Sequence, residues 1–286
     1  MSEPAIAILP YGGKLDRRLT SRPLSELHWP LGCPARLSGG VVGDLGPDDH
    51  LIVFAKREMH FQLSWHCRAR VSLMIIEPKI MSAAHHLLLR LTYRRFFRVF
   101  SYDQGLLARL PNGVFLPFGS TWVPGWQDLD IQKTEDLSLI ASAKRDHPGH
   151  KLRHQVVEYL QREGVPVRVL GRGYEPFEAK SDGLAPFRYS VVIENVQEPN
   201  YFTEKLIDAI LCETVPIYWG CSNIEEYFEP EAMIICKDRA DLEAAIRSVS
   251  AEDYERRLPA LRRQKDAAAH FGDLLGRAAK ALRDSL

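Results

Sequence analysis

The sequence of 286 residues lacks long hydrophobic runs and has no excess of charge of either sign. No stretch reaches the ~20 apolar residues that a membrane-spanning helix needs, and the early apolar run at 5–10 is too short for the core of a signal peptide. Lysine plus arginine and aspartate plus glutamate each number 37, so the formal net charge at pH 7 is zero. No global field would attract nucleic acid, and any anion site must be local.

Cysteine is scarce, and the five cysteines are odd in number and scattered along the chain. Such spacing argues against a disulfide framework and against a zinc cage, and it fits a reducing cytoplasm. The histidines form no HExxH pattern, although four of them lie in two loose groups: His60, His66, His85 and His86. A DxD-type pair, Asp128 and Asp130, falls in a segment that we interpret as a linker. We therefore predict no metal site.

A chain of this length is long for one domain and suits two domains of about 130 to 150 residues. In the second half, strand-like runs alternate with helical patterns, which indicates a parallel sheet with crossover helices. Strands are expected at 137–143, 166–170, 188–193, 214–218 and 232–236, and helices at 150–163, 203–213 and 239–249. The first half offers strand-like runs for a second, similar sheet at 6–9, 51–54, 71–76, 96–101 and 114–116.

Residues 117–136 are rich in proline, glycine and polar residues, which is typical of a linker. We accordingly place an N-terminal domain at 1–130 and a C-terminal domain at 131–286. The last segment, 253–286, has apolar residues at the spacing of one or two amphipathic helices, which we expect to pack back onto the domains. The alternative is that its arginines and lysines contact a partner or anionic lipid at the inner face of a membrane.

The most informative segment is 188–235. A short apolar run at 189–193 suits a buried parallel strand, and apolar residues from Leu206 to Leu211 recur at helical spacing. The polar residues between them would therefore lie at the carboxyl end of the strand. In open α/β sheets ligands bind at that end, and a helix that begins near Thr203 would direct free backbone N–H groups at an anion. The segment predicts an anion-binding site.

Two cations lie at the starts of the predicted helices. Arg153 shares a helical face with Val156, Val157 and Leu160, so its charge is held toward the interior. Positive charge in the first turns of a helix is unfavourable by ~0.3 to 1 kcal/mol unless an anion neutralises it. Lys205 repeats the arrangement, and a diphosphate between the two would remove the conflict. The structural alternative is that both are surface cations paired with acids close by in the sequence, Glu158 and Glu204.

Gly171 and Gly173 follow an expected strand and permit a close backbone approach or a positive φ. The third glycine and the ribose-binding acid of a dinucleotide fingerprint are missing here. Nicotinamide or flavin binding is therefore rejected.

The pattern ENxxxxxYxTEKxxDA at 194–209, followed by VPIYWG at 215–220, closely resembles the donor-binding signature of glycosyltransferase family 10, the α-1,3/4-fucosyltransferases. The resemblance continues through 140–160 and 170–174, and more loosely through 100–122. It implies an α/β fold of GT-B type, in which two Rossmann-like domains face each other across a cleft. It also implies an inverting transferase that uses a GDP-sugar, GDP-fucose above all, and a hydroxyl of a glycan acceptor.

The resemblance also assigns roles to individual residues. Arg153 and Lys205 match residues that contact the donor phosphates, Asn195 and Tyr201 match residues of the nucleoside pocket, and Glu204 matches a carboxylate that accepts hydrogen bonds from donor hydroxyls. Because the sequence has no metal-binding pattern, we expect the two cations and helix N-termini to neutralise the donor's charge, with no cofactor required. Asn195 as a turn residue and Tyr201 as a packing aromatic are the structural alternatives. Three further candidates for donor binding lie nearby or at a strand end: Glu194, Ser142 and Lys144.

Transfer requires a base for the acceptor hydroxyl, and Glu77 is the candidate. It follows the apolar strand 71–76 and precedes Pro78, so it would lie at the carboxyl end of a strand of the N-terminal domain. Its EP dipeptide is similar to the ESP-type base motif of the family, with the serine missing. A helix-entry acid without a catalytic role is the alternative, and the rival bases are Glu58, His60 and Asp103.

We therefore interpret the chain as a fucosyltransferase-type enzyme that uses GDP-fucose. Two other interpretations stay open: transfer of another sugar from another nucleotide, and a nucleotide-sugar-binding protein that has lost catalysis. The sequence does not specify the acceptor, and a bacterial lipopolysaccharide or capsule glycan is the default expectation for a reducing compartment.

Overall fold

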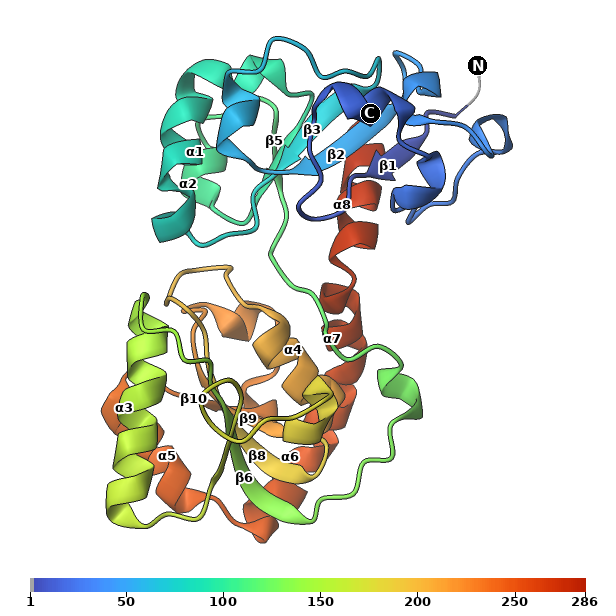
Figure 1. The fold of residues 1–286 in the computed structure, drawn as a ribbon. Coiled ribbons are helices and arrows are strands. Elements are labelled where there is room, and N and C mark those ends of the chain that lie inside the picture. The colour runs from blue at the N-terminus through green and yellow to red at the C-terminus, as the bar shows by residue number, and fades with distance from the viewer. Residues whose placement is uncertain (1–2) are drawn as a thin grey trace. The chain divides into compact units, whose positions relative to one another are not determined.

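The chain divides into two compact α/β units, each built on a five-stranded parallel sheet. The computed structural model describes residues 3–286. The first unit comprises the residues up to Phe118 together with Leu274–Leu286, and the second comprises Gly119–Asp273 (Figure 1). The prediction of two α/β domains with parallel sheets is confirmed.

The sheet of the first unit has the order β1-β2-β3-β4-β5. Its strands are β1 (Ile6–Ile8), β2 (His50–Phe54), β3 (Arg70–Met74), β4 (Val99–Ser101) and β5 (Gly113–Phe115). Its helices are α1 (Lys79–Thr92), α2 (Gln104–Leu107) and α8 (Leu274–Arg283). Alternate residues of the strands enter two different cores, because successive side chains of a strand point to opposite faces. Leu51, Val53 and Leu73 pack with Leu89 of α1, while Ile52 and Met74 pack on the other face.

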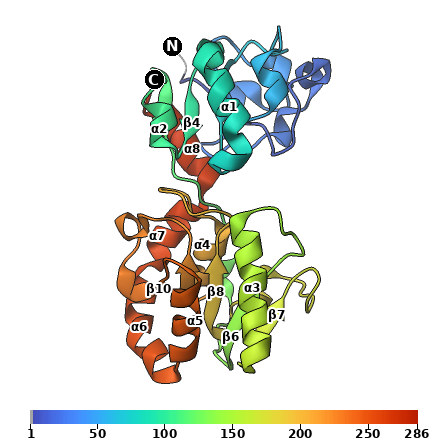
Figure 2. The same ribbon diagram turned by 90° about the vertical axis from the view of Figure 1, so that its left-hand side faces the viewer.

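The sheet of the second unit has the order β10-β9-β8-β6-β7. Its strands are β6 (Glu135–Ile140), β7 (Arg168–Leu170), β8 (Phe187–Ile193), β9 (Val215–Trp219) and β10 (Ile234–Ile235). Its helices are α3 (Pro148–Glu163), α4 (Glu204–Leu211), α5 (Arg239–Ser248), α6 (Ala251–Arg263) and α7 (Lys265–Gly272). Helices α3 and α5 cover one face of the sheet, and α4, α6 and α7 cover the other (Figures 1 and 2). The central strand β8 is therefore buried on both faces, as its nearly continuous apolar sequence predicts.

Helix α3 begins and ends where its sequence directs. Pro148 occupies the first turn, where a missing N–H costs nothing, and Gly164 ends the helix in the left-handed conformation with φ of 65°. No side chain caps the N-terminus of α3, and its first turn contains no acidic residue. Its free N–H groups and positive dipole end are therefore not neutralised by the helix's own acids.

The C-terminal segment differs from the prediction that placed all of 131–286 in one domain. It forms three helices instead of one or two, and α8 belongs to the first unit. The physical reason is its apolar face, which is buried in one core with Ile6 and Ile8 of β1 and with Phe100 of β4. The residues of that face are Leu274, Ala278, Ala279 and Leu282. An amphipathic pattern predicts such a face but does not say which sheet it covers.

The structure also places the boundary between the two units earlier in the chain than the predicted position near 130. The units separate between Phe118 and Gly119, because the first part of the expected linker packs on the second unit. Thr121 donates a hydrogen bond from its hydroxyl to Asp208 of α4, and the backbone N–H of Trp122 donates to the same carboxylate oxygen. Within residues 3–286, no helix is both long enough and apolar enough to cross a membrane.

Candidate functional site

The carboxyl end of β8 meets the N-termini of two helices, α3 and α4. Glu194 and Asn195 directly follow the strand. Gly149, in the first turn of α3, lies so close that a Cβ atom at this position would be 1.7 Å from the carbonyl oxygen of Glu194. The backbone N–H of Gly149 donates to the carbonyl of Asn195 at 3.0 Å. A glycine is therefore required where α3 approaches the strand end.

Glu194 is completely buried and organises the start of α4. Its Oε1 accepts a hydrogen bond from the backbone N–H of Thr203, and its Oε2 accepts one from the Thr203 hydroxyl, both at 2.7 Å. Oε2 also lies 3.7 Å from Nζ of Lys205. Burial raises the pKa of Glu194, and the charge of Lys205 opposes that rise. These contacts make Glu194 a support for Thr203 and Lys205, while the predicted contact with a donor stays a prediction.

Lys205 lies between two carboxylates. Its Nζ is 2.9 Å from Oε1 of Glu204 and 3.1 Å from the hydroxyl of Thr203, and 22% of its side chain is exposed. Burial alone would raise the pKa of Glu204, but the charges of Lys205 and Lys180 outweigh it, so the pKa lies below its usual value. The pairing with Glu204 is the one that the structural alternative for Lys205 requires. The ammonium group has three N–H donors, of which two are hydrogen-bonded to Glu204 and Thr203, and the side chain stays partly exposed.

Arg153 points from α3 to the end of β8 and is buried. Its Nε donates to the carbonyl oxygen of Ile193 at 2.9 Å, and its Nη2 donates to the same oxygen and to Oδ1 of Asn195 at 3.1 Å. Among the described residues, no ion pair joins Arg153 to Glu158, the partner that the structural alternative proposed. Burial lowers the pKa of Arg153 and nearby carboxylates oppose this, so the guanidinium stays charged.

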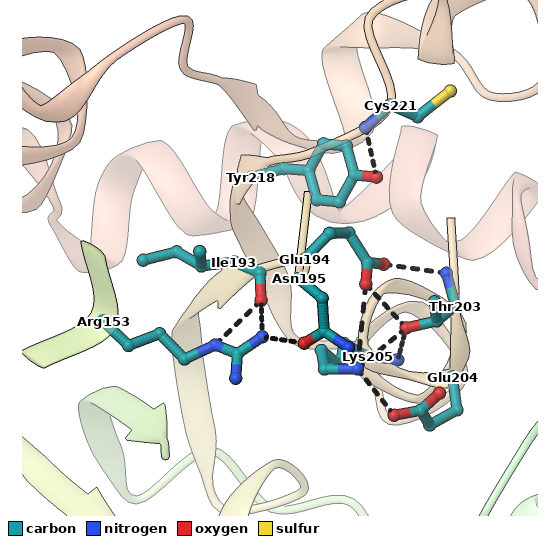
Figure 3. Close-up of polar contacts among 9 residues, drawn as sticks. All are labelled: Arg153, Ile193, Glu194, Asn195, Thr203, Glu204, Lys205, Tyr218 and Cys221. Atoms are coloured by element: carbon teal, nitrogen blue, oxygen red, sulfur yellow. Dashed lines mark hydrogen bonds and ion pairs between the residues drawn. The ribbon is translucent and has the colours of Figure 1, made fainter. Parts of the chain in front are cut away.

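Arg153 and Lys205 therefore lie on either side of Asn195, as Figure 3 shows. The predicted convergence of two cations at two helix starts is present in the structure. Glu194 and Glu204, both named from the sequence, lie beside Lys205 at the start of α4, so the site is not purely positive. We call the set of side chains around this point the β8 cluster. It comprises Arg153, Lys180, Glu194, Asn195, Glu204 and Lys205.

Lys180 is a member of the β8 cluster that the sequence did not reveal. It begins the 3-10 helix η8 (Lys180–Gly183) just before β8, and its Nζ lies 5.5 Å above the ring of Trp122. Burial lowers its pKa, and the carboxylates of Glu204 and Asp208 act against that shift. Its position in a polar loop carries no periodic signal, so only the fold brings it to the other cations. Thr203, by contrast, had a signal: a threonine before a helix is a common N-cap.

Asp208 is a second residue to which sequence reasoning gave no role, although the motif at 194–209 contains it. It is buried in α4, and its Oδ1 accepts hydrogen bonds from the Thr121 hydroxyl at 2.7 Å and the Trp122 N–H at 3.1 Å. Its Oδ2 is buried and has no hydrogen-bond partner among the described residues. Burial raises the pKa of Asp208 from 3.8 to about 6, although Thr121 and Lys180 oppose the rise. An unpaired carboxylate oxygen thus lies beside the β8 cluster.

Replacing Asp208 by asparagine is expected to change how stability depends on pH. The folded protein holds the Asp208 proton more tightly than the unfolded chain does. The resulting stabilisation of the folded state is complete below about pH 4 and is lost as the pH rises through about 6. The difference corresponds to at most about 3 kcal/mol. The amide of the variant cannot ionise, so Asp208→Asn gains stability relative to the wild type between pH 4 and 6. Urea unfolding of both proteins at several pH values measures this gain, and a pH-independent difference would contradict it.

The remaining predicted donor residues are Tyr201, Ser142 and Lys144. Tyr201 is buried and follows Asn200, which has a φ of 60° and whose Oδ1 accepts a hydrogen bond from Tyr227. Ser142 and Lys144 follow β6, and the carbonyl of Lys144 lies 3.1 Å from a ring nitrogen of His154. Their roles stay predictions.

Glu77 lies in the first unit, after β3 and before α1, where the sequence placed it. It is half-buried, and the hydroxyl of Tyr11 donates to its Oε1 at 3.4 Å. Burial raises the pKa of Tyr11, and the Glu77 carboxylate adds to the rise. Two rival bases have structural tasks: Asp103 caps α2 by accepting from the N–H of Leu106, and His60 is buried in hydrogen bonds to neighbouring side chains. Glu58 is exposed within the 3-10 helix η5 (Arg57–His60).

Gly171 and Gly173 adopt the positive φ values that the sequence allowed, 120° and 93°. A Cβ atom on Gly171 would lie 2.1 Å from the carbonyl oxygen of Ala141. Gly171 therefore serves close packing between the ends of β7 and β6, whereas a Cβ atom on Gly173 would make only an ordinary contact with Ala143.

The segment that forms this site matches a known family. Residues 132–256 match the sequence model of glycosyltransferase family 10 (fucosyltransferase), C-terminal part. The match covers less than half of the chain. The match covers the strands β6 to β10 and all of the β8 cluster, so the predicted resemblance is confirmed.

Curated relatives agree with the family match. The chain is 34% identical over 67 residues to the α-(1,3)-fucosyltransferase FucT of Helicobacter pylori, which covers 23% of this chain and 14% of that protein. It is 28% identical over 139 residues to a 4-galactosyl-N-acetylglucosaminide 3-α-L-fucosyltransferase of Pan troglodytes, which covers 46% of this chain and 38% of the relative. The matched parts thus span less than half of either relative.

Solved structures identify the fold. An α1,3-fucosyltransferase with GDP-fucose superposes with a TM-score of 0.52 at 17% identity, covering 90% of this chain and 82% of the other. TarM superposes with a TM-score of 0.53 at 10% identity, covering 82% and 55%. At these identities the likeness shows the fold alone. Together with the two parallel sheets, it confirms the predicted GT-B class.

Proposed function

We propose that the protein is an inverting glycosyltransferase that moves fucose from GDP-fucose to a hydroxyl of a glycan acceptor. The observation that carries the proposal is the convergence of Arg153, Lys205 and Lys180 at the N-termini of α3 and α4, inside the family 10 domain. Helix N-termini with adjacent cations are the standard protein device for holding phosphate groups. The relatives, named as fucosyltransferases, supply the choice of sugar.

In this proposal the cations of the β8 cluster bind the donor's diphosphate, and Glu204 binds its hydroxyl groups. The diphosphate lies at the uncapped N-terminus of α3 and takes hydrogen bonds from Lys205 and Lys180, with Arg153 supplying charge from beneath. Glu204 then exchanges its bond with Lys205 for hydroxyl groups of the donor, which a carboxylate can accept. Asn195 and Tyr201 line the nucleoside pocket. The cations meet the donor's charge themselves, so we propose that no metal or other cofactor is required.

The chemical step that we propose is a single displacement. The acceptor oxygen forms a bond to the anomeric carbon, the bond from that carbon to the GDP oxygen breaks, and Glu77 takes the acceptor's proton. Charge develops on the departing diphosphate, and preorganised cations at that point lower the barrier. The products are a fucosylated glycan and GDP.

The first experiment separates the nucleotides. GDP, UDP, ADP and CMP are added one at a time, and thermal unfolding is followed. A nucleotide at 100 times its Kd adds about 2.7 kcal/mol of stability, so GDP should raise the Tm and the others should not. A rise with UDP alone would point instead to another nucleotide sugar.

The second experiment measures consumption of GDP-fucose against a mixed set of glycans, with and without a chelator. Turnover that survives chelation supports the proposal. Binding of GDP without turnover on any glycan would indicate a nucleotide-sugar-binding protein that has lost catalysis.

We propose a bacterial lipopolysaccharide or capsule glycan as the acceptor. The five free thiols fit action in a reducing cytoplasm.

A further inference from the structure

Helix α1 carries an apolar stripe that faces solvent. Ile80, Leu87 and Leu91 are 59%, 63% and 88% exposed, and Ala84 lies between them in the same row. Their spacing of four, three and four residues places them on one side of the helix. The opposite side is buried against the core of the first unit through Leu89. Figure 2 shows α1 as an outer element of that unit.

A neighbouring loop extends this apolar surface. Phe61 is 62% exposed and Leu63 is fully exposed. The loop is fixed to the α1 region before Phe61 and between the two apolar residues: a ring nitrogen of His60 lies 2.8 Å from a ring nitrogen of His85, and Arg95 donates to the carbonyl of Gln62. Two large apolar side chains thus face solvent beside the helix. Transfer of these side chains from water to an apolar environment would be favourable.

The charge around this surface is mainly positive, although Asp103 lies 3.9 Å from Lys79 and Glu58 is exposed just before the loop. Residues 78–102 contain five lysines and arginines and no aspartate or glutamate, although the whole chain is neutral. Lys79 and Arg90 are exposed, and helical spacing places them along one flank of the apolar stripe, while Arg94 is exposed just after the end of α1. Two copies of such a surface would repel each other, whereas an anionic surface would attract it.

We propose that this surface, made by the exposed side chains of α1 and of the loop at 61–63, binds an anionic lipid bilayer. The apolar side chains enter the boundary between headgroups and acyl chains, and the basic flank contacts lipid phosphates. The C-terminal alternative considered from the sequence lacks such a face at α8, because its leucines are buried in the first unit. The inference goes beyond the transferase reaction and does not depend on it.

The test is sedimentation of the full chain with vesicles of phosphatidylcholine alone and of phosphatidylcholine mixed with phosphatidylglycerol. The protein should sediment with the anionic vesicles only, and less so as salt is raised, because screening weakens surface charge. Arg90→Gln/Arg94→Gln should lower the partition coefficient about 25-fold, since each basic side chain near an anionic surface contributes about fivefold. Leu87→Ser/Leu91→Ser should lower it at least as much.

A matched control neutralises two exposed arginines of α6, Arg256→Gln/Arg263→Gln, and should sediment like the wild type. Thermal unfolding establishes that each variant is folded. Equal sedimentation of the wild type and the α1 variants overturns the proposal, as does failure of the wild type to bind anionic vesicles. A concentration-dependent dimer that Leu87→Ser/Leu91→Ser abolishes, without vesicle binding, would assign the surface to a second copy of the chain instead.

Discussion

Lys205→Ala is expected to weaken GDP binding by about 2 to 5 kcal/mol, which is at least about 30-fold in Kd. In the structure, Nζ of Lys205 lies between Glu194 and Glu204, at the point where α4 begins. We expect the diphosphate to replace Glu204 as its partner. Without the ammonium group, the donor's charge would meet two carboxylates instead of a cation, so the loss includes repulsion as well as a missing contact.

The measurement is GDP titration by calorimetry at one salt concentration. Lys205→Arg keeps the charge and should retain most of the affinity. Lys151→Ala serves as the matched control, because it removes an exposed lysine from α3. Unfolding of the free proteins must be measured alongside, since the alanine variant leaves Glu194 without its nearest cation. A folded Lys205→Ala that binds GDP like the wild type would make Lys205 only the partner of Glu204.

The elements around the β8 cluster were predictable because their signals are local. A short apolar run specifies β8, apolar residues at helical spacing specify α4, and the short polar segment between them places Glu194 and Asn195 at the strand end. The family motif then singled out Lys205. Each of these inferences depends on residues within a few positions of one another.

The contacts of the cluster were not predictable, because they join distant segments. Lys180 reaches the other cations only through the packing of η8, and nothing in its own neighbourhood marks it. Asp208 lies in the family motif, but only the fold shows its contact with Thr121. The same limit applies to α8: its apolar spacing predicts a buried face, but the chain must fold before that face selects the core beside β1. The pairing of Lys205 with Glu204 shows a further limit, since sequence does not say whether a cation is neutralised before the ligand arrives.

Glu77→Gln is expected to lower kcat about 10²- to 10⁴-fold and to leave the Kd for GDP unchanged. The amide keeps the size of the side chain but cannot take the acceptor's proton. Tyr11→Phe removes the hydroxyl that donates to Oε1 of Glu77 and should give a smaller loss of kcat, because it only positions the carboxylate. Single-turnover rates with saturating GDP-fucose measure both effects.

The decisive comparison for the base is with Asp103→Asn. Asp103 also lies near a strand end of the first unit, yet it caps α2 and its Oδ2 is 3.5 Å from Nδ1 of His86. Its replacement should reduce stability by about 0.5 to 2 kcal/mol through the lost cap, with the chemical step intact in the folded fraction. Glu77→Gln should show the reverse, normal stability with a slow chemical step. If the two patterns are exchanged, the carboxylate that accepts the proton is Asp103 and the glutamate is a helix-entry residue.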